Sequence, residues 1–409
     1  MRAGHAGAGD SRLDGHVAPV PAALVLGLGT LISHGFGLAL VPAMLPRISS
    51  ELDVGYGVLG AAVAIGLVAY SAGALSTSWI LERVPGERLL VASYIVSASG
   101  LIVSGLAPSA LVLAVGVVIL GFVAPLSWSV TIHVAGSTTA ANARAAVMAT
   151  ASGGAALGVL INGVLVQTSS SLHSWRLSFV MAAALAALPI VGARLLYRRP
   201  IERPSSQGSV RAGYRRVLGT RPGRVIIMAG LVAGLGGFPF NVFLTATAVD
   251  EMHVSALSAA AVWWLIGIVG LTAGPVLGRY ADRASALSAL TAGAIAYGAG
   301  LAVLTFLWDY LGLLIAAVGY SVMNYPIWGL AGALANDRFD SGLAVRSISL
   351  GLIVASLGGA AGNAVAGAWI DATSSFRVPV AAMAALVALL SAWFWAVGRS
   401  GDLENPANG

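Results

Sequence analysis

The sequence predicts an all-α membrane protein in which twelve transmembrane helices form two pseudo-symmetric six-helix bundles. Three observations support this fold class. The 409 residues are 58% hydrophobic and only 9% charged, whereas a soluble domain is about a quarter charged. Charges disappear for about twenty residues at a time, as in helices that cross a hydrocarbon core. The two halves of the chain also repeat each other at an offset of about two hundred residues, which indicates a duplicated unit.

Charged and turn-forming residues divide the chain into twelve apolar segments. At about 1.5 Å per residue, about twenty helical residues cover a hydrocarbon core of about 30 Å. Twelve crossings return both termini to the same side of the membrane. We expect the spans at residues 20–45, 56–81, 89–106, 110–133, 145–167, 177–196, 225–249, 256–278, 287–306, 311–334, 348–370 and 378–397.

The distribution of arginine predicts the orientation and the domain boundary. All 22 basic residues are arginine, and only Arg47, Arg176 and Arg377 fall on the side opposite the termini. Cytoplasmic loops carry an excess of basic residues, so we expect an integral protein of the bacterial inner membrane with both termini in the cytoplasm. The expected domains are a cytoplasmic tail at 1–19, a bundle at 20–197, a basic cytoplasmic linker at 198–224, a second bundle at 225–397 and a cytoplasmic tail at 398–409.

The composition also excludes several functions. A sequence pI near 10.0 suits nucleic-acid binding, but the arginines gather in loops of one side rather than on a surface interleaved with aromatic residues. The absence of cysteine excludes disulfides and thiolate metal sites. No phosphate-binding Gly-x4-Gly-Lys-Ser/Thr motif supports ATP drive on this chain. We therefore expect no cofactor, no metal and no nucleic acid, with the lipid bilayer, a small-molecule substrate and protons as partners.

A polar motif marks the repeat most clearly. Residues 278–283 (Gly-Arg-Tyr-Ala-Asp-Arg) follow one apolar run, and Glu82 with Arg83 stands at the equivalent point of the first half, where Pro85 disturbs the copy. An acid at the membrane edge accepts hydrogen bonds from a neighbouring helix N-terminus, and an adjacent arginine pairs with carboxylates or phosphates. A plain loop that obeys the positive-inside rule is the alternative. The predicted conformational latch consists of Glu82, Arg83, Gly278, Asp282 and Arg283.

With this motif, the twelve spans and the repeat, residues 20–397 resemble the major facilitator superfamily. The hexapeptide at 278–283 is similar to the family's loop motif Gly-x-x-x-Asp-Arg between the second and third helices of a half. The resemblance implies a secondary transporter with a cytoplasmic latch that favours the outward-facing state. Two departures count against a drug–proton antiporter: Val117 stands where many members have a fourth-helix arginine, and the fifth span has glycines without a Gly-Pro pair.

The residues inside the spans restrict the substrate. His34 lies near the middle of the first span and is the candidate for proton coupling as well as substrate binding, because an ionisable residue inside a membrane is a functional candidate. A neutral histidine that bonds between helices is the alternative. The other candidates for substrate binding are uncharged, and packing between helices is the alternative for each: Tyr70, Trp128, Asn162, Asn241, Trp263, Trp264, Asn324, Tyr325, Trp328 and Asn363.

Charge indicates the class of solute. A cation requires a buried acid and a phosphate requires central basic groups, and the spans supply neither. We therefore expect a small neutral, amphipathic or weakly acidic solute, moved by alternating access. Arg47 is expected to anchor a loop, with a place beside an outward-facing cavity as the alternative.

A membrane enzyme and a non-transporting receptor or scaffold are the alternative classes of function. A membrane enzyme requires clustered His, Asp, Glu or Ser at membrane depth, and His34 has no carboxylate partner in the sequence, so we expect no enzymatic activity. A membrane receptor or scaffold that keeps the fold without transporting is supported by the disturbed first copy of the motif. The predicted fold is complete in one chain, so we expect a monomer.

Overall fold

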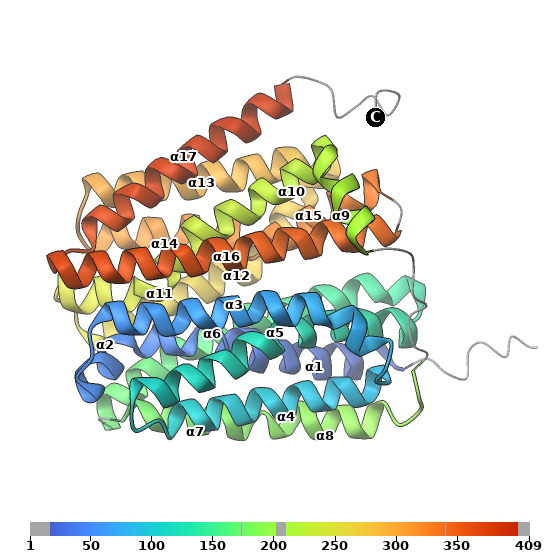
Figure 1. The fold of residues 1–409 in the computed structure, drawn as a ribbon, viewed down its shortest axis with the longest axis horizontal. Coiled ribbons are helices and arrows are strands. Elements are labelled where there is room, and N and C mark those ends of the chain that lie inside the picture. Colours follow the sequence, from blue (N-terminus) through green and yellow to red (C-terminus); the bar gives the residue numbers. More distant parts are fainter. Residues whose placement is uncertain (1–16, 173, 202–209, 340, 400–409) are drawn as a thin grey trace, which may run out of the picture.

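The computed structural model describes residues 17–172, 174–201, 210–339 and 341–399. Twelve helical segments in these ranges are long and apolar enough to cross a membrane. Figure 1 shows them running side by side in two groups, the first half of the chain (blue to green) below and the second half (yellow-green to red) above. Most of the two predicted tails and residues 202–209 of the predicted linker lie outside the described residues.

Six spans form the first bundle. Its first span contains a π-helical segment near its middle, where the backbone hydrogen bonds join residues five apart instead of four as in an α-helix. Its sixth span is divided at Ala186. The elements are α1 (Pro19–Thr30), η2 (Leu31–Phe36), α2 (Leu40–Leu52), α3 (Tyr56–Leu81), α4 (Gly86–Gly105), α5 (Ala110–Thr138), α6 (Ala141–Leu172), α7 (Trp175–Leu185) and α8 (Ala187–Leu196).

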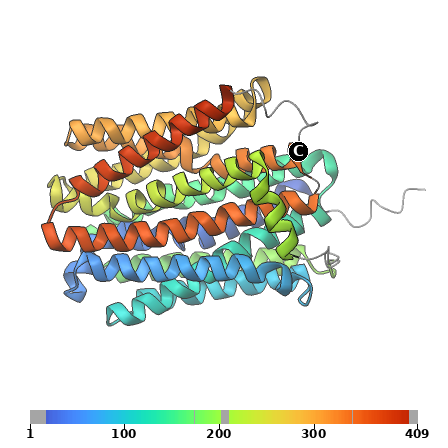
Figure 2. The same ribbon diagram turned by 45° about the horizontal axis from the view of Figure 1, so that its top comes forward.

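The second bundle repeats this plan. Its first span again has a π-helical segment near the middle, and Pro326 breaks its fourth span because proline lacks the N–H that a helix interior needs. The elements are α10 (Arg221–Leu231), η3 (Val232–Gly237), α11 (Phe238–Ala246), η4 (Thr247–Glu251), α12 (Ala256–Arg283), α13 (Ala286–Phe306), α14 (Tyr310–Asn324), α15 (Ile327–Arg338), α16 (Ser341–Thr373) and α17 (Arg377–Arg399). The short α9 (Val210–Gly219) precedes them and lies across the ends of α10 and α16 (Figure 2).

The helices extend beyond most of the predicted spans. α2 continues to Leu52, α5 to Thr138, and α10 begins at Arg221, inside the range predicted as linker. The predicted limits lie at charged or turn-forming residues, but a helix continues past the apolar core where long side chains reach polar surroundings. For the same reason, residues 278–283 form the last turns of α12, and the expectation that this motif lies in a loop is wrong.

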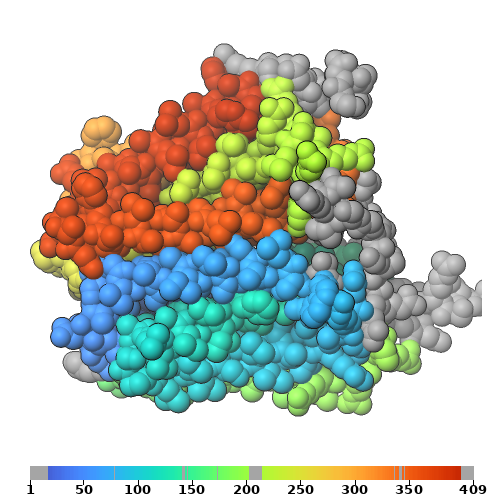
Figure 3. Space-filling model, in the orientation of Figure 1, coloured from blue at the N-terminus to red at the C-terminus, as the bar shows by residue number. Residues whose placement is uncertain are grey.

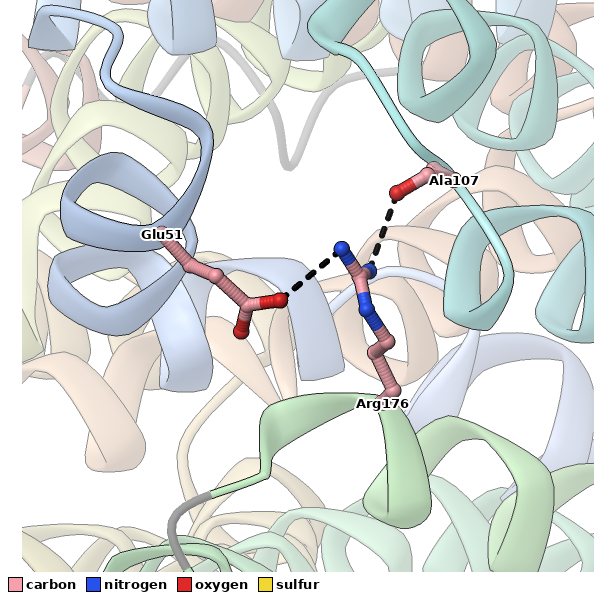
Figure 4. A network of polar contacts seen from close by, with 3 residues as sticks. All are labelled: Glu51, Ala107 and Arg176. Carbon is pink, nitrogen blue, oxygen red and sulfur yellow. Dashed lines mark hydrogen bonds and ion pairs between the residues drawn. The ribbon is translucent and has the colours of Figure 1, made fainter.

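The repeat in the sequence is also a repeat of structure. Arg176 at the start of α7 donates to the carbonyl of Ala107 at 2.9 Å, and its counterpart Arg377 donates to the carbonyl of Thr305 at 3.2 Å. Each arginine thereby ties the start of the sixth span of its bundle to the end of the third. Figure 4 shows that Arg176 also forms an ion pair with Glu51, at 2.9 Å.

The bundles have two ends, which we name by position. The linker end carries α9 and the last described residues of α17, on the right of Figure 1; the far end carries the loops at 53–55, 252–255 and 374–376. Between the bundles, α3 lies beside α16 along most of its length, as the blue and orange surfaces in Figure 3 show, and the two helices run antiparallel (Figure 1). α6 packs on α12, and α2 packs on α11. Any site shared by the bundles is therefore bordered by these three helix pairs.

Candidate functional site

Glycines bring the helices beside the bundle interface close together near mid-length. A Cβ atom on Gly35 of η2 would lie 2.7 Å from the nearest Cα of α6. Farther along α6, Leu160 packs so closely on α12 that a Cβ on Gly267 would lie 2.5 Å from it, and one turn on, Gly270 of α12 receives the ring of Tyr325. Small residues permit such close approach of helices in a membrane. Consequently η2, α6, α12 and the break between α14 and α15 lie at one depth.

The first bundle places His34 beside Trp128 at this depth. The two rings meet edge to face with their centroids 6.3 Å apart, and Ser33 Oγ lies 2.9 Å from His34 Nδ1. Both residues are half-buried. His34 lies in the π-helical segment η2, and π-helical turns are frequent at functional sites.

The second bundle contributes half-buried aromatic and amide side chains at the same depth. Trp264 lies against α6, where a Cβ on Gly163 would be 2.3 Å from its indole ring, so this tryptophan lies at the contact of the two bundles. Tyr325 packs on α12 beside the break at Pro326, and the Oδ1 atom of Asn324 points toward Gly237 in η3. Together with His34 on η2 and Trp128 on α5, these are the predicted site residues that lie half-buried at mid-depth in the two bundles.

The other predicted binding residues lie in helix packing in this conformation. Asn162 is fully buried and donates to the carbonyl of Gly35 at 3.0 Å, an interhelical bond. Trp263 is fully buried and donates its indole N–H to Thr245 at 2.9 Å. Their contact with a solute stays a prediction. The same applies to the buried Tyr70, Asn241 and Asn363 and to Trp328, which packs on Gly351.

The predicted latch residues lie at the linker end. Arg83 donates to the carbonyl of Trp79 at 2.9 Å, and its guanidinium lies 4.0 Å from the centroid of that indole ring. Glu82, Asp282 and Arg283 are exposed, and Gly278 has open space around its Cα. Within the described ranges, neither Glu82 nor Asp282 accepts a hydrogen bond. The predicted bond to a helix N-terminus is not formed in this conformation, and the latch stays a prediction.

At the far end the two bundles bond to each other. The Tyr56 hydroxyl donates to Asp250, and the backbone N–H of Gly57 donates to Asp371 Oδ2 at 2.8 Å. The first turn of α3 carries unpaired N–H groups and a partial positive charge, so a carboxylate is a suitable partner. Nearer mid-depth, the hydroxyls of Ser71 and Ser356 lie 2.6 Å apart. These hydrogen bonds therefore join the two bundles at the far end and near mid-depth.

The sequence reasoning missed these far-end carboxylates as functional residues. Asp371 stands in the last turn of α16, and Tyr56 starts α3. The signal was available once spans 2 and 11 are taken as antiparallel neighbours, because an acid that ends one then faces the start of the other.

Comparisons with known proteins identify the fold. A family model described as Major Facilitator Superfamily matches residues 26–362. The crystal structure of a mutant of the nucleoside transporter NupG has a TM-score of 0.73 at 10% identity, covering 92% of this chain and 99% of that chain. A bacterial homolog of the human lysosomal transporter Spinster, solved inward-facing in unoccupied and occupied forms, has a TM-score of 0.69 at 14% identity, covering 93% and 96%. At these identities the likeness concerns the fold. A comparison with curated proteins found no match.

Proposed function

We propose, since the chain belongs to the Major Facilitator Superfamily, that it is a secondary active transporter for a small neutral, amphipathic or weakly acidic solute. The observation that carries this proposal is the set of half-buried polar and aromatic side chains that both bundles present at mid-depth. His34 and Trp128 come from the first bundle, and Trp264 and Tyr325 from the second. A site divided between two bundles changes its access when one bundle rocks against the other.

Alternating access is the mechanism we propose for this transporter. The hydrogen bonds at Tyr56 and Gly57 join the two bundles at the far end, and the predicted latch at the linker end is not engaged. Both observations support an inward-facing state, with the linker end in the cytoplasm of a bacterial inner membrane as the arginine distribution favours. We propose that one chain completes this cycle, so that the working unit is a monomer.

The chemistry of the spans supports an uncharged or weakly acidic solute. Each Asp and Glu in the described ranges lies in a loop or near a helix end, so no carboxylate there is placed to bind a cation at mid-depth. Trp128, Trp264 and Tyr325 offer flat apolar rings, and His34 and Asn324 offer hydrogen-bonding groups. This combination suits a planar or amphipathic molecule. Nucleosides, named for one structural relative, are neutral molecules with a planar base and belong among the first solutes to test.

We propose His34 as the group that couples transport to protons. Among the histidines of the described ranges, His34 lies nearest the middle of a span, and imidazole exchanges protons near neutral pH. His34 is half-buried as a residue, and its Nδ1 lies 2.9 Å from Ser33 Oγ. A proton bound there changes the charge of the site, and hence the preference for one conformation.

The test is a flux screen with the purified protein in proteoliposomes under imposed pH and voltage gradients. Neutral and weakly acidic solutes, nucleosides included, are compared with organic cations and sugar phosphates. We expect saturable flux of at least one neutral or weakly acidic solute above that of protein-free liposomes. Preference for a dication or a sugar phosphate contradicts the proposed solute class, and binding without flux favours the receptor.

A further inference from the structure

A pocket separate from the mid-depth residues lies between the bundles at the far end. Its volume is about 540 Å³, within the range of about 300–1,000 Å³ that is usual for small-molecule sites. α2, α6 and α7 form its walls in the first bundle, and α11, η4 and α12 form those in the second. Met44 in its wall follows His34 by about 15 Å along the first span. We name this space the far-end pocket.

The wall from the first bundle carries a positive charge. Arg47 lines the pocket and donates from Nη1 to the carbonyl of Ser169 at 3.0 Å, which fixes the guanidinium in place. Its remaining N–H groups donate to no described residue, although a guanidinium has five. Glu51 also lines the pocket, but its carboxylate is paired with Arg176 at 2.9 Å. Among the described residues of this wall, Arg47 therefore carries the charge that has no ion-pair partner.

The wall from the second bundle carries the opposite charge. Asp250 lines the pocket and accepts a hydrogen bond from Tyr56 at Oδ2, while its Oδ1 has no partner in the described chain. The rest of the pocket is largely apolar, with the buried Met44 and Trp175 among its lining residues. The buried indole nitrogen of Trp175 also lacks a hydrogen-bond partner within the described ranges. The pocket thus offers one free cationic group, one free anionic group and an apolar surface.

We propose that the far-end pocket binds a small zwitterion, whose anionic group pairs with Arg47 and whose ammonium pairs with Asp250. A neutral molecule leaves both Arg47 and Asp250 without an ion-pair partner, and an anion or a cation leaves one of the two unpaired. The same chemistry occurs in a free amphoteric solute and in the headgroup of an aminophospholipid. Because the two charges come from different bundles, a bound zwitterion bridges them. Occupancy therefore favours the closed far end, by the difference in affinity for the two states. This conformational part rests on the proposed alternating access, whereas binding does not.

Binding is tested on purified protein with phosphoethanolamine, which carries both charged groups. Titration calorimetry in detergent compares it with glycerol phosphate and ethanolamine, which each carry one. We expect phosphoethanolamine to bind saturably and at least tenfold more tightly than either. Arg47→Gln and Asp250→Asn should each weaken binding at least tenfold, and Arg47→Lys should keep most of it. Arg377→Gln and Asp309→Asn, which change charges outside the pocket at the same end, should alter affinity less than twofold.

Three results would overturn the proposal: no saturable binding, equal affinity for the single-charge probes, or unchanged affinity in both pocket variants.

Nanodiscs identify the source of the zwitterion. If phosphatidylethanolamine discs weaken phosphoethanolamine binding relative to phosphatidylglycerol discs, a lipid headgroup occupies the pocket; equal binding indicates a free solute. Spin labels at Leu111→Cys and Leu311→Cys, exposed far-end positions on different bundles, should show a larger short-distance population with phosphoethanolamine. No change would overturn the conformational part. Flux is measured separately, so failure here leaves the proposed transport testable.

Discussion

The backbone N–H of Gly57 donates a 2.8 Å hydrogen bond to Asp371, joining the first turn of α3 to the last turn of α16 across the bundle interface. The two helices are antiparallel, so their other ends meet at the linker end, where Glu82 follows α3. Asp371 thus lies beside the N-terminus of the partner helix at the far end, and Glu82 is the acid at the linker end of α3. The far-end acid is bonded in this conformation and the linker-end acid is not.

Asp371→Ala should open the far end. The lost bond is charge-assisted but exposed, so we expect a change of about 1 kcal/mol, roughly a fivefold shift in population. Distances between spin labels at Leu111→Cys and Leu311→Cys measure this shift, and the natural absence of cysteine leaves no competing label site. Asp309→Ala is the matched control, because Asp309 accepts from Gly312 within its own helix end. Equal distance distributions in the two variants would contradict a far-end latch.

Asp282→Asn should impair transport more than Glu82→Gln. The charge pair of the second half is intact at the end of α12, whereas Pro85 disturbs the first copy. Both side chains are exposed and distant in sequence from the mid-depth residues, so substrate affinity should remain nearly unchanged. Flux and binding of the transported solute, measured on purified protein, check this prediction. Equal loss of flux in the two variants counts against an asymmetric latch.

His34→Gln should uncouple transport from the proton gradient. Glutamine keeps hydrogen-bonding groups of similar reach but binds no proton near neutral pH. We expect flux driven by an imposed pH gradient to fall at least tenfold, while exchange of solute at equal pH persists. Ser33→Ala is the control, because it removes the neighbouring hydroxyl and keeps the imidazole. A glutamine variant with full proton dependence removes His34 from the coupling mechanism.

Gly158→Ala should destabilise the first bundle. A Cβ there would lie 2.7 Å from the Cα of Gly35, and backbone cannot yield as a flexible side chain can. Overpacking of this kind costs about 1–3 kcal/mol. Thermal unfolding in detergent should therefore show a Tm lower by several degrees. Gly274→Ala is the control, because no atom lies within 4 Å of its added Cβ. Equal Tm values would contradict the close approach of η2 and α6.

The sequence was sufficient to predict where the spans lie, because each apolar run ends at charges or turn residues. For example, α3 runs from Tyr56 to Leu81 as predicted. It was also sufficient for the repeat, because Arg176 and Arg377 make the same contact in each bundle. Hydropathy does not record backbone bonding, so it did not predict η2 and η3. The 278–283 motif was expected in a loop because its charged residues end the apolar run, whereas α12 continues through them to Arg283.

Contacts between the bundles could not be predicted in the same way. Gly57 and Asp371 are 314 residues apart in the chain, and no local pattern relates them. Trp263 and Trp264 are neighbours in sequence, yet one is fully buried in helix packing and the other lies at the interface. Arg47, expected to anchor a loop, instead donates to the carbonyl of Ser169 inside α6, and it also lines the far-end pocket.

The most direct test of alternating access is a reversible lock of the far end. A Cβ on Gly57 would lie 3.3 Å from Asp371 Cγ, so Gly57→Cys with Asp371→Cys brings two thiols within reach of a disulfide. Flux of the transported solute is measured in proteoliposomes before oxidation, after oxidation and after reduction, with each single cysteine variant as a control. We predict that flux stops on oxidation of the double variant and returns on reduction. Undiminished flux through the fully cross-linked protein would contradict the account.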